Sequence, residues 1–109
     1  MHFKIELYEN NGRKIIEDFI ISLTDKTISK IMWLFDILEK YGPNIGMPYV
    51  KKITVNLFEL RIRKQESIRF FFILKKNTII ILHGFKKKKM KIPIKEIEIA
   101  KNRLTKYNI

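Results

Sequence analysis

The sequence contains no cysteine, and this absence excludes several kinds of chemistry. Disulfide bonds, thiol nucleophiles and metal sites built on cysteine are all ruled out. We therefore predict neither a metal site of the usual kind nor a cofactor. A chain without cysteine also suits the reducing cytoplasm, which is the location that we expect.

Long apolar runs are missing as well. No stretch approaches the ~20 residues that a transmembrane helix needs, and Met1 is followed by strand-like alternation rather than by a signal peptide. Proline and glycine are sparse, with three and four residues, so no linker divides the chain. We expect a soluble, unprocessed protein without a membrane partner, folded as one domain over residues 1–109.

Acidic residues are few, and most of the basic excess lies in the second half of the chain. Residues 1–56 hold eight Lys or Arg against seven Asp or Glu, whereas residues 57–109 hold fifteen against four. A net charge of +12 concentrated in this way is typical of nucleic-acid-binding proteins. Acidic proteins and anionic lipids are alternative partners.

The first half of the chain predicts one strand and two helices. Alternating apolar residues at positions 3–7 indicate a strand with one buried face. Apolar residues at helical spacing then predict helices over residues 15–23 and 28–38, with Thr24-Asp25 as the start of the second helix and Gly42-Pro43 as its end. We expect residues 44–56 to be an irregular connection.

The second half predicts three strands and a last helix. Strand patterns cover residues 57–63, 68–75 and 78–85, and the links between them are so short that the three strands must form an antiparallel meander. A helix is expected from about Pro93 to Tyr107. The predicted class is α+β with the order β-α-α-β-β-β-α, in which the two N-terminal helices cover an antiparallel sheet.

The strand over residues 57–63 alternates between apolar and charged side chains. Its apolar residues should face the core, and its other face, which we predict to lie outside the core, carries Glu59, Arg61 and Arg63. Arg69 opens the next strand and should lie near Arg61. Two adjacent guanidinium groups repel each other unless an anion lies between them, so this pair predicts an anion-binding site.

A lysine cluster follows the third of these strands. Between Phe85 and Pro93 it comprises Lys86, Lys87, Lys88, Lys89 and Lys91. A charge run is commonly a solvated surface, but here the arginine pair points independently to an anionic ligand. The preceding run of Phe70, Phe71 and Phe72 is interpreted as core rather than as a platform for stacking bases.

At these residues the sequence resembles a known family. The similarity is carried by Leu57-Phe58-Glu59-Leu60-Arg61, Ile68-Arg69, Leu82-His83-Gly84-Phe85-Lys86-Lys87-Lys88, Pro93, Glu96-Ile97 and Ala100. Over its whole length the chain resembles the phage-derived, HigB-like branch of the RelE toxin superfamily. The resemblance implies a compact RelE-like fold, in which two N-terminal helices back the sheet and the opposite concave face holds the active site.

The resemblance further implies a toxin of a type II toxin–antitoxin system. Such a protein is a ribosome-dependent endoribonuclease that cleaves messenger RNA, without a metal, by attack of the ribose 2′-OH. An antitoxin encoded beside it, which we expect to be a small helix-turn-helix protein, neutralises the toxin. By the order of motifs, Arg61 and Arg69 would hold the scissile phosphate. Either Lys87 or Lys88 would match the basic residue after the last strand.

Further RNA contacts, to message or ribosomal RNA phosphates, are expected from Arg63, Lys86, Lys89 and Lys91. The best-studied RelE branch has a tyrosine near the start of its final segment. The corresponding residues 91–94 of this sequence contain none. The general base is therefore open between Glu59, His83 and a lysine of lowered pKa. His83 is more simply interpreted as a structural residue. The alternative function is a basic RNA- or ribosome-binding repressor on the same fold that does not cleave.

Overall fold

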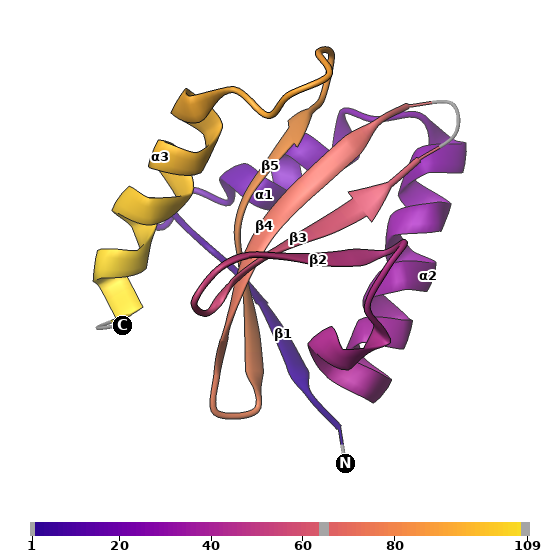
Figure 1. The fold of residues 1–109 in the computed structure, drawn as a ribbon. Helices are drawn as coiled ribbons and strands as arrows, with labels where there is room; N and C mark the ends of the chain where they lie inside the picture. Colours follow the sequence, from indigo (N-terminus) through magenta and orange to yellow (C-terminus); the bar gives the residue numbers. More distant parts are fainter. Residues whose placement is uncertain (1, 64–65, 108–109) are drawn as a thin grey trace.

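The protein is described by a computed structural model that covers residues 2–63 and 66–107 (Figure 1). Its elements follow in the order β1 (Lys4–Leu7), α1 (Ile15–Ile21), α2 (Asp25–Tyr41), the short 3-10 helix η1 (Gly42–Ile45), β2 (Val50–Thr54), β3 (Leu57–Ile62), β4 (Ile68–Lys75), β5 (Thr78–Lys86), α3 (Ile94–Leu104) and the 3-10 turn η2 (Thr105–Tyr107). The class is α+β with a C-terminal helix, as predicted, and the arrangement is consistent with a RelE-like fold.

The five strands form one sheet in the order β1-β5-β4-β3-β2. The antiparallel meander of β3, β4 and β5 is confirmed. Lys75 pairs with Thr78 across the tight turn between β4 and β5, in which Lys76 takes a left-handed φ of 55°. Of the predicted link over residues 64–67, positions 64–65 lie outside the described residues.

The prediction of a wholly antiparallel sheet is wrong at one edge. β1 runs parallel to β5, with Lys4 opposite Thr78 and Leu7 opposite Ile81. A parallel neighbour needs a long connection between the two strands. Here that connection comprises both N-terminal helices and the strands β2 to β4, so local spacing along the chain could not reveal the pairing.

A second prediction is also wrong, because part of the expected connection over residues 44–56 forms strand β2. Only Val50 is buried in this strand, and Lys51 and Lys52 are exposed. The strand pairs with β3 on one side and forms the outer edge of the sheet on the other. Exposed lysines are a common protection of edge strands against further pairing, and they hide the apolar alternation that identifies a strand.

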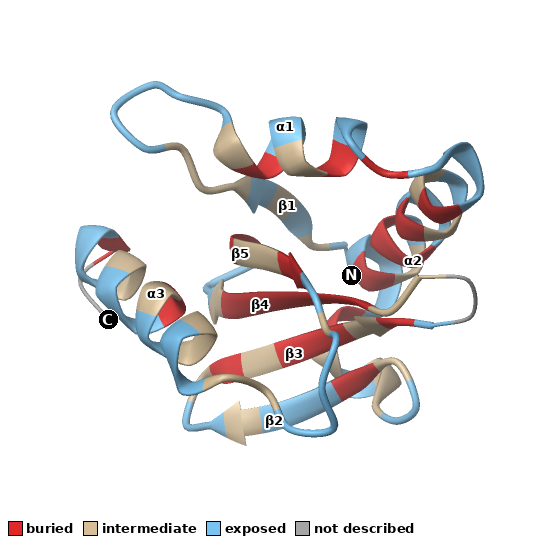
Figure 2. Cartoon of the chain, turned by 90° about the horizontal axis from the view of Figure 1, so that it is seen from above, coloured by how far each residue is buried: buried red, intermediate tan, exposed pale blue. Residues whose placement is uncertain are grey.

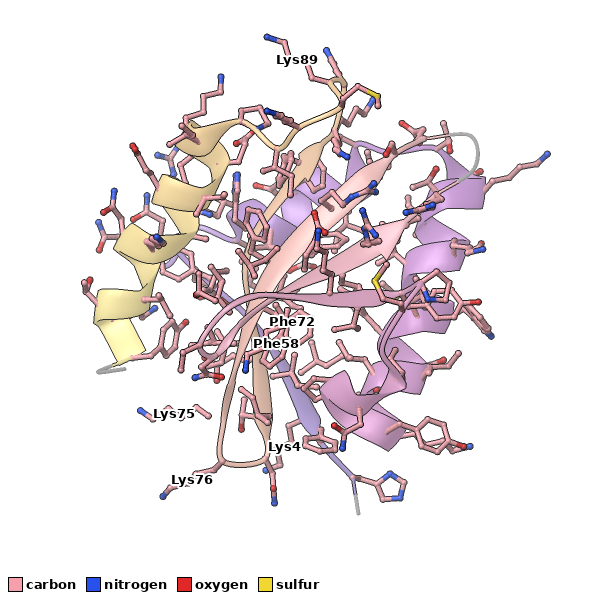
Figure 3. All side chains as sticks on the ribbon, in the orientation of Figure 1. Lys4, Phe58, Phe72, Lys75, Lys76 and Lys89 are labelled. Atoms are coloured by element: carbon pink, nitrogen blue, oxygen red, sulfur yellow. The ribbon has the colours of Figure 1, made fainter. Side chains whose placement is uncertain are left out.

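The sheet separates two apolar layers. Helices α1 and α2 cover one face and α3 covers part of the other, so that the buried residues lie between helices and sheet (Figure 2). On the α1/α2 side Phe58 stacks on Phe72 with ring centroids 5.3 Å apart, and Figure 3 shows the two rings on neighbouring strands. The expectation that Phe70, Phe71 and Phe72 belong to the core is confirmed, because none of the three is exposed.

The face that carries Glu59 was predicted to lie outside the core, and this is wrong. The α3 layer includes Phe71, Phe85 and Ala100, so apolar side chains surround the charged positions on this face. Glu59 is only 1% exposed and Arg69 only 4%. The alternation along β3 is real, but its charged face is buried at Glu59, where β3 pairs with Phe71 of β4.

A polar network ties the start of α2 to the end of β5. Thr24 caps the helix as predicted, accepting a hydrogen bond from the Thr27 backbone N–H. The hydroxyl groups of Thr24 and Thr27 donate to Oε1 of Glu66 at 3.0 and 2.6 Å, and Lys86 Nζ lies 3.0 Å from Oε2. The hydrogen bond from Thr27, followed by the contact with Lys86, lowers the pKa of Glu66 to about 2.

This network predicts a pH-dependent contribution to stability. Because folding lowers the pKa of Glu66 from 4.5 to about 2, its contribution is complete above pH 4.5 and disappears as the pH falls towards 2. Glu66→Gln should therefore lower the melting temperature at pH 7 and have little effect near pH 2. Glu98→Gln, at an exposed position on α3, is the control. A Glu66→Gln deficit of the same size at both pH values would contradict this account.

In the described ranges, none of the helices has the length and apolar character needed to cross a membrane.

Candidate active site

Two arginines face each other across the centre of the charged face. Arg61 on β3 is the direct cross-strand partner of Arg69 on β4. The anion that this pair requires is supplied by the protein itself, because the Glu59 carboxylate lies between them. Glu59 Oε1 is 3.2 Å from Arg61 Nε, and Glu59 Oε2 is 3.5 Å from Arg69 Nε. The expectation that only a ligand could relieve the repulsion is therefore corrected.

Arg69 is held rigidly by the backbone around it. Its Nη1 donates to the carbonyl oxygens of Ile68 and Ile62, at 3.1 and 3.4 Å. Burial lowers the pKa of Arg69, and the neighbouring Glu59 opposes this shift. A guanidinium group nevertheless stays charged in proteins. The fold thus holds a nearly buried positive charge in a fixed orientation.

The contacts of Glu59 are ionic rather than well-aligned hydrogen bonds. Among the described residues, neither carboxylate oxygen of Glu59 has a partner with hydrogen-bond geometry, and the same is true of Nε in both arginines. The short distances still give charge attraction, because Coulomb energy depends on separation rather than on alignment. Because both Nε atoms are buried against Glu59, an additional anion would have to be bound by the terminal guanidinium nitrogens.

Lys87 completes this group of charges, which we call the arginine site: Glu59, Arg61, Arg69 and Lys87. The segment after β5 is anchored there by a 2.8 Å hydrogen bond from the Lys87 N–H to the carbonyl of Ser67. Burial lowers the pKa of the Lys87 ammonium group, and the positive charge of Arg69 lowers it further. Three cations around one carboxylate leave the arginine site with a formal charge of +2.

The remaining predicted basic residues are distributed around this site. Arg63 is exposed just beyond β3, close enough that its charge lowers the pKa of Arg69 and Lys87. Lys86 is paired with Glu66. The structure places Lys88 and Lys89 along a different cavity, and Figure 3 shows Lys89 projecting beyond the sheet. Lys91 is exposed.

His83 lies in a separate polar cluster between β5 and α3. Its Nε2 is 2.9 Å from Glu96 Oε1, and its Nδ1 is 3.4 Å from Arg103 Nη1, so both ring nitrogens face protein partners. Burial lowers the pKa of His83, although the hydrogen bond with Glu96 opposes this shift. A neutral ring that donates from Nε2 to the carboxylate satisfies these contacts. This placement agrees with a structural residue.

Glu96 was named from the sequence only among the motifs that carry the family resemblance, and Arg103 was not predicted. Both side chains contact His83, and Arg103 Nη1 also donates to the Leu82 carbonyl at 2.7 Å. A signal was present: Glu96, Ala100 and Arg103 recur at helical spacing on the inward face of α3. Polar residues on such a stripe require polar partners on the strand that they cover.

The arginine site can hold and neutralise a phosphate. Guanidinium groups bind phosphate oxygens through paired N–H donors, and preorganised positive charge stabilises charge that develops during a reaction. A lysine whose pKa is lowered in this way is a candidate proton acceptor. Across the described parts of the chain, no three His, Asp or Glu side chains are grouped as metal ligands.

Comparison with known proteins identifies the family of this chain. Curated proteins gave no match. The model of the phage-derived protein Gp49-like family, also described as DUF891, matches residues 18–105. The match includes the entire arginine site and most of the fold. The chain therefore belongs to the Gp49-like family, which is part of the RelE/HigB-like toxins of type II toxin–antitoxin systems.

Proposed function

We propose that this protein is a ribosome-dependent endoribonuclease that cleaves messenger RNA at the arginine site and so inhibits translation. The observation that carries the proposal is the convergence of Arg61, Arg69 and Lys87 around one buried carboxylate. Cleavage of RNA by its own 2′-OH requires charge stabilisation and proton transfer, and these groups supply both. Membership of the toxin family supports the same function.

Arg61 and Arg69 are proposed to bind the scissile phosphate. When the 2′-oxygen attacks phosphorus, the P–O5′ bond breaks and a 2′,3′-cyclic phosphate forms. Negative charge builds up on the non-bridging oxygens during this step, and the two fixed guanidinium groups stabilise it. Arg61 reaches the ligand from a side chain that is 13% exposed, whereas Arg69 acts from beneath the surface.

Lys87 is proposed to be the general base. In its neutral form its Nζ accepts the proton of the 2′-OH, and the departing 5′-oxygen takes up a proton from solvent. Burial and the adjacent positive charge of Arg69 lower the pKa of Lys87 below its usual value, which favours the neutral form relative to an isolated lysine. Glu59, which already contacts both arginines, is assigned to hold them in place.

The proposal also includes the partners that the family implies. A cognate antitoxin follows from the toxin family. We propose that it is a small helix-turn-helix protein and that the messenger RNA is presented on the ribosome. Arg63 and Lys91 are exposed near or after the sheet and are assigned to RNA phosphates.

Expression of the protein without its antitoxin tests the function directly. We expect translation to stop within minutes of induction in a bacterial host, and messages to be cut at positions that depend on ribosome occupancy. Incorporation of labelled amino acid and mapping of RNA ends measure the two effects. Blocked translation with intact messages would favour the non-cleaving repressor, and unchanged translation would exclude both functions.

A further inference from the structure

A basic cavity lies at the end of β5, where the edge of the sheet is open. Pairing between β1 and β5 stops at Leu7 and Ile81, whereas β5 continues to Lys86. The outer edge of the last residues of β5 therefore has no neighbouring strand in the described chain. A cavity of 640 Å³ occupies this space between α1, β5 and the start of α3.

The wall of the cavity is apolar and its rim is positively charged. It is lined by Phe19, Gly84, Phe85, Pro93, Glu96 and four lysines, namely Lys86, Lys88, Lys89 and Lys95. Lys86 is paired with Glu66, and Glu96 is bonded to His83. The other three lysines have no ion-pair partner within the part of the chain that the structure describes. The net charge of the cavity thus favours an anionic ligand.

Close packing positions the aromatic wall. Phe19 on α1 packs edge-to-face against Phe70, with ring centroids 6.0 Å apart. Gly84 allows this approach, since a Cβ atom there would lie 2.6 Å from Phe70 Cε1 and 3.0 Å from Phe19 Cδ2. A flat ring beside phosphate-binding cations is the combination by which proteins bind single-stranded nucleic acids.

The lysine cluster connects this cavity with the arginine site. Lys87 belongs to the arginine site, and its immediate neighbours Lys86 and Lys88 line the cavity. Both sites therefore adjoin the same short segment at the end of β5. A ligand chain with regularly spaced phosphates can contact both sites at once.

We propose that this cavity binds a nucleotide of single-stranded RNA that flanks the scissile bond, with its base against Phe19 and its phosphate on Lys88 and Lys95. This inference rests on the proposed function, because it extends the substrate strand beyond the arginine site. RNA is favoured over an acidic peptide because the cavity offers an aromatic wall for a base as well as cations. A carboxylate-rich segment would use only the cations.

The test uses RNA that cannot be cut. A single-stranded RNA of ~8 nucleotides, within the range bound by single-strand-binding modules, carries 2′-O-methyl groups at every position. Its affinity is measured by fluorescence anisotropy for the wild type, for Lys88→Glu/Lys95→Glu, and for the control Lys26→Glu/Lys101→Glu. The control changes the net charge equally at exposed positions outside the cavity. Thermal unfolding verifies that all three proteins are folded.

We expect Lys88→Glu/Lys95→Glu to weaken RNA binding ~10-fold or more relative to the control. Its salt dependence should fall by about 0.7 in log–log slope, because one neutralised single-strand phosphate contributes about 0.7. NMR signals of the Gly84 amide and the Phe19 ring should shift when RNA is added to the wild type. These measurements need no cleavage, so a wild type that binds in this way but cuts no message would disprove only the proposed function.

Equal affinity of the two variants, or RNA binding without shifts at Gly84 and Phe19, would overturn the inference. Oligoglutamate serves as the probe for the other class of ligand. If it shifts the same signals and RNA does not, the cavity is a site for an acidic protein segment, and the inference is likewise overturned.

Discussion

Replacement of Arg69 by alanine should lower the cleavage step at saturating ribosome by ~10²-fold or more, the loss seen when one preorganised charge-stabilising donor is removed. Arg69 is 4% exposed and held by two backbone carbonyls, so water cannot readily replace its charge. Single-turnover cleavage of a message on a programmed ribosome measures the effect. Binding to the ribosome should change much less than the rate.

Two controls separate this effect from misfolding. Arg69→Ala leaves Glu59 buried with one fewer cation, which is itself destabilising, so thermal unfolding must be measured alongside activity. Arg69→Lys keeps the charge but loses the planar guanidinium group, and we expect it to fold while remaining slow. Arg63→Ala, at an exposed position nearby, should weaken binding without slowing the cleavage step. Arg69→Ala that binds weakly but cuts at the normal single-turnover rate contradicts the assigned role.

Replacement of Lys87 by alanine should reduce the single-turnover rate by ~10²- to 10⁴-fold, the usual contribution of a general base. The wild-type rate should also increase with pH from the neutral into the alkaline range. The sign follows because the base acts as the neutral amine, and burial together with Arg69 lowers the pKa of Lys87 from its usual value of 10.5. Cleavage measured over a pH series, with ribosome integrity verified at each pH, provides the profile.

Lys88→Ala is the matched control, because Lys88 adjoins Lys87 in sequence but lines the neighbouring cavity. It should retain the alkaline rise and most of the rate. The other bases predict different profiles. A rise complete by about pH 5 that disappears in Glu59→Gln would assign the role to Glu59. A midpoint near about 6.5 that disappears in a folded His83→Gln would assign it to His83.

Local patterns determined most of the fold but little of the arrangement at its edges. The meander of β3 to β5 was predictable because its strands alternate and its turns are short. Helix α2 was predictable from its apolar stripe and from the Thr24 cap. Strand β2 was not, since an edge strand with one buried residue has no apolar alternation. The parallel pairing of β1 depends on the path of the whole chain.

Part of the candidate site was likewise predictable from the sequence, and part was not. Parity along β3 and the short link to β4 placed Arg61 and Arg69 together from the sequence alone, and the register confirms it. The sequence could not show how deeply Glu59 is buried, because its burial depends on packing in the folded sheet, where Phe71 of β4 lies directly opposite. The sequence also could not show which of Lys87 and Lys88 belongs to the arginine site. Their environments differ only because the chain leaves the sheet at that point.

By itself, then, the sequence determined which residue types are available and which of them share a strand face, because these properties depend on neighbours a few positions apart. Tertiary structure alone decided which charges are buried, which lysine enters the arginine site, and that His83 faces Glu96 and Arg103. Burial and pKa depend on what the rest of the chain packs against a residue. The chemistry that we assign to this site therefore follows from long-range packing of a locally encoded pattern.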